Sequence, residues 1–294
     1  MKIKIRYAVL VLFFAPKFAF TQPVSNTSGI QDSLSRLSSL IWKQKTDSGR
    51  LQANTIFFNK FQSVLQTASS ADNAFDSISG ITRIASTDNK FRIFTWNIPL
   101  SDGTNRYFGF IQFKINSTIV IPLKSNFSEI EDFDTKQFTP QMWYGAIYYK
   151  LIEVEIRGHK AYTLLGWDGY TLNSNRKFID IVYLDPNGNI NFGLPVFKTD
   201  KGIKTRVVLE YAEKANMLLR YDYQAIIIEK NKKIKKENAW LIVMDRMVPM
   251  DPSMEGVRKY YVPTGDTYDG YIFRNGYWTL VENVDVVNKL NMVK

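Results

Sequence analysis

Tight-turn signals between short alternating runs constrain this chain more than any other feature. Residues 152–156 alternate apolar side chains with two glutamates, and Val207, Leu209 and Tyr211 alternate with Arg206 and Glu210. Such period-two runs are typical of half-buried strands. Turn-forming segments separate runs of this kind at 157–160 (RGHK), 185–189 (DPNGN), 222–224 (DYQ) and 274–276 (RNG). Strands joined by tight turns pair antiparallel, so the sequence predicts a β-meander.

Helical periodicity is confined to the region before the first strands. Apolar residues at helical spacing predict one amphipathic helix, and an aromatic band within residues 51–65, after a capping Asp47 and Ser48, predicts a second. The two apolar sets are Ile30, Leu34, Leu37 and Ile41, and Phe57, Phe58, Phe61, Val64 and Leu65. Few later residues are expected to be helical, and residues 139–147 are one exception.

The expected fold class is mainly β, or α+β overall. An antiparallel meander of this many strands curls or splits. It should form a curved sheet, a sandwich or a barrel-like body, with the N-terminal helical pair packed on it. No long Pro/Gly/Ser linker interrupts the chain. The expected organisation is therefore a helical segment at 22–75 and one antiparallel β-rich domain at 76–294.

Residues 1–21 have the pattern of a secretory signal peptide. A basic start (MKIKIR) precedes a short apolar run and a small-residue exit, which places cleavage after Thr21. The apolar run is shorter than the roughly 20 residues that a membrane-spanning helix needs. The expected locations are the periplasm, the outer surface or the medium, with no transmembrane segment in the mature chain.

The chain contains no cysteine, so core packing alone must hold it together. An exported protein of this size without disulfides suits a bacterial envelope better than an animal extracellular space. Removing the first 21 residues lowers the formal charge from +10 to +6. Five lysines gather at 229–237, which is interpreted as a solvated hairpin tip rather than a phosphate-binding patch. The run lacks arginines and interleaved aromatics, so no nucleic-acid partner is expected.

The sequence lacks the residues that several common catalytic and metal-binding sites need. The single histidine, His159, lies in a turn between cationic neighbours, which disfavours a Ser-His-Asp triad. With no cysteine and one histidine, the chain lacks the residues for a Cys/His zinc site or a cysteine nucleophile. The segment DPNGNIN at 185–191 offers oxygen ligands but departs from the EF-hand pattern and is interpreted as a hairpin turn. No metal, cofactor or catalytic residue is expected.

Carboxylates supply the remaining catalytic option. Glycoside cleavage uses two acidic groups that face each other across a bond. Acidic residues gather on loop-like segments near the C-terminus, at Asp245, Asp251, Glu255, Asp266 and Asp269. Sequence alone does not pair them.

An aromatic, an Asp-Gly and a tyrosine occur twice, as GWDGY at 166–170 and TYDGY at 267–271. Each presents a flat apolar face beside a carboxylate, as sugar or peptide binding requires. Each also suits a turn, because Asp accepts backbone hydrogen bonds and Gly takes φ > 0. The duplication favours the architectural interpretation. The candidate binding residues are Trp167, Asp168, Tyr170, Tyr268, Asp269 and Tyr271.

Several stretches resemble a family of exported proteins from Bacteroidota-type bacteria that has no assigned function. The resemblance rests on FRIFTW (91–96), LLGWDG (164–169), NFGLPVF (191–197), MDPSMEG (250–256), YDGY (268–271) and WTLV (278–281). It covers residues 88–288 and implies export, but it carries no activity.

The sequence therefore predicts an exported, non-catalytic envelope or secreted protein that binds a glycan, a peptide or another envelope protein. Aromatic residues make up 14% of the chain, enough to line a recognition surface as well as a core. The alternatives are a carboxylate-dependent glycoside hydrolase and a structural subunit of an envelope assembly.

Overall fold

The computed structural model describes residues 27–87, 89, 91–114, 117–125, 130, 132–230 and 233–284. The predicted signal peptide lies outside the described residues. The chain is mostly β, with 52% strand and 20% helix, and the described strands form several antiparallel sheets with no closed barrel. The predicted fold class is thus confirmed, and the body consists of three stacked sheets.

Two helices form the first layer: α1 (Thr27–Lys43) and α2 (Asp47–Leu65). The hydroxyl of Thr46 caps α2 by accepting from the Gly49 N–H, one residue earlier than the predicted cap. The aromatic band of α2 packs on one face of the first sheet, where the Phe61 ring meets Phe94 edge-on at 5.2 Å between centroids. A short 3-10 turn, η1 (Ala68–Asp72), follows.

The first sheet has the order β1-β2-β3-β4. Its strands are β1 (Thr82–Ala85), β2 (Phe91–Pro99), β3 (Asn105–Lys114) and β4 (Thr118–Lys124). Helices cover one face and the second sheet covers the other, so β2 is buried along nearly its whole length. Burial on both faces explains why β2 carries apolar residues on both: Phe91 and Ile93 face the second sheet, and Phe94, Trp96 and Ile98 face the helices.

The second sheet has the order β11-β7-β6-β5, with β8 paired to β7. The strands are β5 (Ile147–Ile156), β6 (His159–Asp168), β7 (Ser174–Leu184), β8 (Ile190–Phe192) and β11 (Val207–Ala212). The β5–β6 turn is Arg157-Gly158, with φ of 53° and 80°, a pair of left-handed residues that matches strand twist. Asp185 holds the β7–β8 turn by accepting from the N–H groups of Asn187 and Asn189, so both predicted turns are confirmed.

The third sheet has the order β10-β9-β15-β14-β13-β12. Its strands are β9 (Phe197–Thr199), β10 (Gly202–Lys204), β12 (Leu219–Lys230), β13 (Lys233–Pro249), β14 (Tyr261–Arg274) and β15 (Tyr277–Val284). The predicted 274–276 turn joins β14 to β15, and the described part of the lysine-rich run lies in the β12–β13 hairpin, where Lys230 pairs with Lys233. One pair, β15 with β9, is parallel.

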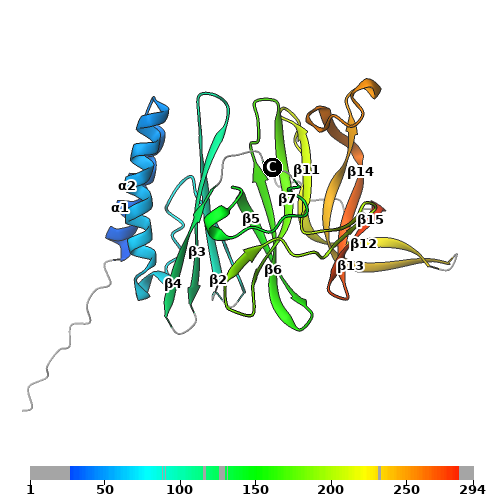
Figure 1. Ribbon diagram of the computed structural model, residues 1–294, viewed down its shortest axis with the longest axis horizontal. Helices are drawn as coiled ribbons and strands as arrows, with labels where there is room; N and C mark the ends of the chain where they lie inside the picture. Colours follow the sequence, from blue (N-terminus) through cyan, green and yellow to red (C-terminus); the bar gives the residue numbers. More distant parts are fainter. Residues whose placement is uncertain are drawn as a thin grey trace, which may run out of the picture.

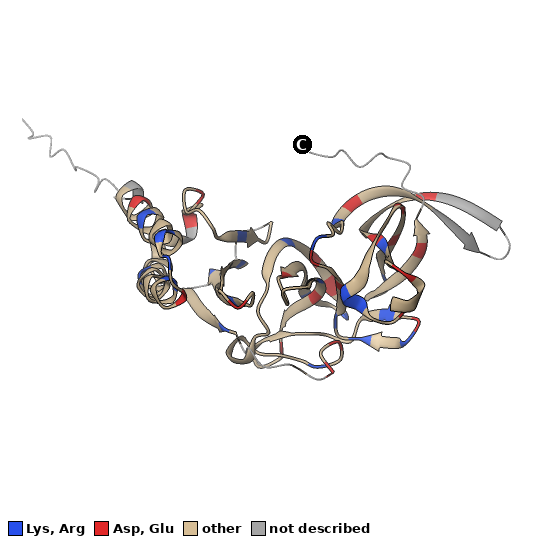
Figure 2. Cartoon of the chain, turned by 90° about the horizontal axis from the view of Figure 1, so that it is seen from above, with Lys and Arg blue, Asp and Glu red and all other residues tan. Residues whose placement is uncertain are grey.

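Figure 1 shows the four layers side by side, from the helices through the first and second sheets to the third. Each interface has its own apolar core. Polar bonds also cross the layers: the buried Trp278 indole donates to the Thr163 hydroxyl at 2.9 Å. Basic and acidic residues are interspersed over helices and sheets (Figure 2).

Two local predictions are wrong. Residues 222–224 were expected to turn, but they lie inside β12, where Tyr223 pairs with Trp240. Long-range pairing with β13 overrides the local turn preference. Residues 139–147 contain only the 3-10 turn η2 (Pro140–Met142), because Trp143 is extended, Gly145 is left-handed with φ 88°, and Ile147 begins β5.

Candidate functional site

A cleft of about 900 Å³ opens where β3 of the first sheet faces the start of β7 and the end of β6 in the second. Residues 132–134 form part of its rim, and Met247 and Arg258 close it from the side of the third sheet. Its volume lies in the upper part of the range for small-molecule sites. Aromatic walls come from Tyr107, Phe133, Tyr144, Tyr170 and Phe178.

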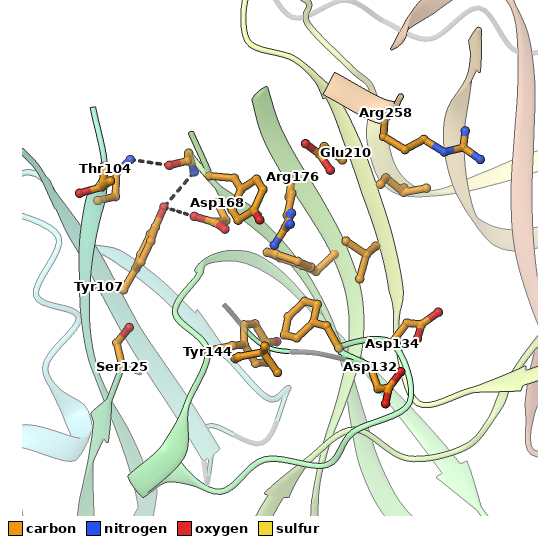
Figure 3. Close-up of a pocket in the computed structure, with 18 of the residues that line it drawn as sticks. Thr104, Tyr107, Ser125, Asp132, Asp134, Tyr144, Asp168, Arg176, Glu210 and Arg258 are labelled. Carbon is orange, nitrogen blue, oxygen red and sulfur yellow. Dashed lines mark hydrogen bonds between the residues drawn. The ribbon is translucent and has the colours of Figure 1, made fainter. Parts of the chain in front are cut away.

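A row of three charged residues runs across one wall of the cleft. Asp168 on β6 lies directly opposite Arg176 on β7, and Arg176 lies directly opposite Glu210 on β11. Residues opposite each other in antiparallel strands share a face. The order is therefore carboxylate, guanidinium, carboxylate, and Figure 3 shows the three side chains along the same wall.

Asp168 is fixed from the opposite sheet. The Tyr107 hydroxyl donates to its Oδ1 at 2.7 Å, and the Gly169 N–H donates to the same hydroxyl at 2.8 Å. The Asn105 amide donates to the Gly169 carbonyl at 2.8 Å. Burial raises the pKa of Asp168 to about 6, because the hydrogen bond from Tyr107 and the charge of Arg176 only partly offset the lost hydration. This carboxyl therefore takes up a proton near neutral pH.

Arg176 stacks on a neighbouring ring instead of pairing with a described acid. Its guanidinium carbon lies over the Tyr170 ring, 3.0 Å from the centroid. Its Nε has no hydrogen-bond partner among the residues that the structure describes. Glu210, at the other end of the row, accepts from the Ser174 hydroxyl at 2.7 Å. The row thus keeps hydrogen-bonding capacity for a ligand in the cleft.

A buried ion pair lies below the cleft on the same face of the sheet. Arg206 and Asp180 are both 0% exposed, with Nε to Oδ2 at 3.0 Å. The Tyr144 hydroxyl, which lines the cleft, donates to Asp180 at 2.8 Å. Burial raises the pKa of Asp180, opposed by the charge of Arg206 and the Tyr144 hydrogen bond. The Arg206 guanidinium also donates to the Lys136 carbonyl at 2.6 Å. This bond ties residues 132–136, termed the rim segment, to the second sheet.

The six candidate residues fall into two separate places. Asp168 and Tyr170 line the cleft. Trp167 belongs to the opposite face of β6, because successive residues of a strand alternate faces, and it does not line the cleft. The Asp168-Gly169 pair does mark a corner, where β6 ends.

The second copy lies inside β14, so its predicted turn role is wrong. A register shift between Tyr268 and Gly270 marks a bulge there. Asp269 binds Arg246 through both carboxylate oxygens and accepts from the Asn283 N–H at 3.0 Å. Tyr271 is buried against Phe197 in the core between the sheets. These contacts are structural, and the two copies do not share a site.

Sequence reasoning missed Tyr107, Arg176 and Glu210. Arg206 was expected on the solvent side of a half-buried strand, yet it is fully buried, because the rim segment folds over that face. A charged residue at an alternating position of a strand does not show whether another segment covers it. Spacing shows which side chains share a face but not what lies above it.

Comparisons with protein-family models, with curated proteins and with solved structures gave no match. Among the described residues, no three His, Cys, Asp or Glu side chains gather so that they could hold a metal ion. Within the same residues no helix has the length and apolarity to cross a bilayer.

Proposed function

We propose that this is an exported protein that binds a glycan in the cleft between the first and second sheets. The observation that carries the proposal is the Asp168–Arg176–Glu210 row, which lies in one wall of an aromatic-lined cleft of about 900 Å³. Planar charged groups hold the neighbouring hydroxyls of a sugar through paired hydrogen bonds, and aromatic faces cover its C–H surface.

The fixed geometry of the row supports binding. Tyr107 orients Asp168, and Ser174 orients Glu210, before any ligand arrives. A preorganised site loses less conformational entropy on binding. Arg176 between the two acids supplies donors, and the acids supply acceptors, a combination that polyhydroxylated ligands need.

Export forms part of the proposal. It is supported by the signal-peptide pattern of residues 1–21 and by the resemblance to exported proteins of Bacteroidota-type bacteria. The periplasm, the outer surface and the medium all fit. Extracytoplasmic glycans are then the available ligands.

A glycan-array screen with the chain from residue 22 onward tests the binding proposal. We expect a discrete set of bound glycans, and at least tenfold weaker binding for Arg176→Ala. Arg83→Ala is the control, since Arg83 pairs with Asp76 at the surface of β1 outside the cleft. A blank array with folded protein, or equal binding by Arg176→Ala, would contradict the proposal.

Glycoside hydrolysis is the second candidate, favoured by the protonatable Asp168 two strands from Glu210. Two strand spacings separate their backbones by roughly 10 Å. The separation of the two carboxyl groups decides between inverting and retaining cleavage. Asp168 would give its proton to the glycosidic oxygen. Glu210 would take a proton from the water that attacks the anomeric carbon.

Release of reducing ends from the glycans that bind distinguishes the two candidates. Hydrolysis predicts release by the wild type and a loss of about 100-fold or more in both Asp168→Asn and Glu210→Gln. Binding without release by the wild type would leave the cleft a recognition site and remove the hydrolase candidate.

A further inference from the structure

A second aromatic surface lies on the β12–β13 hairpin, away from the cleft. Tyr223 and Trp240 lie directly opposite each other in the ladder, and their ring centroids are 5.6 Å apart. Tyr221, on the same face, stacks against Trp240 at 5.1 Å and 24° between planes. Figure 1 shows this hairpin running out beyond the rest of the third sheet. These three residues are termed the hairpin platform.

The platform is exposed although its aromatic side chains carry large apolar areas. Trp240 is 54% and Tyr223 is 45% exposed. Single exposed apolar residues are normal on soluble proteins, but here the exposed rings are contiguous. Packing does not require this exposure, because Tyr221 alone joins the platform to the core between the second and third sheets.

A pocket of about 490 Å³ adjoins the platform. Trp240 and Tyr221 line it together with the end of β5 at 153–155 and with parts of β13 and β14. The exposed Asn238 amide lies two residues before Trp240, on the same side of the strand. Flat rings therefore stand beside side-chain hydrogen-bonding groups.

The charges around the pocket favour a neutral ligand. Glu153 is held by Lys160 at 2.9 Å and by the Thr87 N–H and hydroxyl. Glu237 forms an ion pair with Arg274. Glu155 adds a further carboxylate at the rim. Arg274, the only cation among the described residues that line the pocket, is paired with Glu237, so no unpaired cation there faces an anionic ligand, whereas hydroxyl groups find acceptors.

The aromatic area of the platform is small compared with a stable protein interface. Two half-exposed rings offer roughly 200 Å² of aromatic surface. A stable dimer needs about 800 Å² from each partner. One or two sugar rings match the available area.

We propose that the hairpin platform binds a neutral glycan chain by stacking on Trp240 and Tyr223, with Asn238 as a hydrogen-bonding neighbour. This site is independent of the cleft. Glu153 on β5 lies opposite Tyr162, six residues before Asp168 on β6, which separates the two sites by roughly 20 Å along the strand.

Native affinity gels that contain a neutral β-glucan, a xylan or a galactomannan test the proposal. We expect at least one of them to retain the wild type, Trp240→Ala to lose retention at least tenfold, and Tyr223→Ala to lose it severalfold. Trp42→Ala is the matched control, because Trp42 is 45% exposed on α1. That control should keep wild-type retention.

The outcomes that overturn the platform differ from those that overturn the cleft. Retention of Trp240→Ala and Tyr223→Ala at the wild-type level, or no retention of the wild type by any of the three polysaccharides, rejects the platform. Self-association that Trp240→Ala abolishes, measured by sedimentation without sugar, rejects it in favour of a second copy. Loss of retention in Arg176→Ala alone assigns the sugar to the cleft. Circular dichroism of both aromatic variants identifies any loss of fold.

Discussion

The Tyr107 hydroxyl reaches from the first sheet to the Asp168 carboxylate of the second across 2.7 Å. This bond joins two layers at the point where the cleft opens. Because the same hydroxyl also accepts from the Gly169 N–H, one side chain fixes both halves of the Asp-Gly corner. The candidate site is thus built by contact between sheets rather than by one loop.

Tyr107→Phe should lower the free energy of unfolding by about 1–3 kcal/mol, because it leaves a buried carboxylate and a buried N–H without their partner. Urea denaturation measures the loss. Tyr260→Phe, at an exposed site on the 3-10 turn η4 (Arg258–Tyr260), is the control and should change stability by less than about 0.5 kcal/mol. Equal stability of the two variants would show that the inter-sheet bond contributes nothing.

Asp168→Asn should become more stable relative to the wild type as pH rises from 4 to 8. The folded-state pKa of about 6 lies above the unfolded value near 3.9, so the folded protein binds this proton more tightly. The wild type therefore loses that stabilisation between pH 4 and 6, whereas the Asp168→Asn variant does not. The difference should approach, at most, about 3 kcal/mol. Denaturation of both proteins at each pH measures it, and a pH-independent difference would refute the raised pKa.

Arg206→Met should cost about 3–5 kcal/mol, because Asp180 is left charged and buried without its counterion. Combining it with Asp180→Leu should recover part of the loss, since no lone charge then remains. Arg83→Ala, which breaks a surface pair with Asp76, should cost less than about 1 kcal/mol. Chemical denaturation of the four proteins gives the comparison, and a double variant no more stable than Arg206→Met would refute the argument.

Phe61→Ala should cost about 3–5 kcal/mol, because Phe61 is fully buried between α2 and the first sheet. Ile56→Ala on the same helix is the control, since Ile56 is 56% exposed. If thermal denaturation showed equal losses for both variants, the helix pair would not be held by this aromatic core.

Predictions from sequence succeeded where local patterns decide the structure. Helical spacing from Ile30 to Ile41 identified α1, and Asn-Gly or Gly-containing turns identified three hairpins. They failed at residues 222–224, where polar residues that favour turns pair across a ladder with β13. The exposure of Trp240 was likewise invisible, because an apolar strand residue gives no sign of whether a second layer covers it.

The sequence by itself determined the β-rich class, the two helices, most turns and the absence of disulfides, because these depend on side-chain period and on local backbone preference. Only the tertiary structure decided which of the two Asp-Gly-Tyr segments meets a cleft. It also brought Asp168, Arg176 and Glu210 into one row, and it buried Arg206 beneath a folded rim. These outcomes depend on strand order and on layer stacking, which arise from long-range packing that no local pattern encodes.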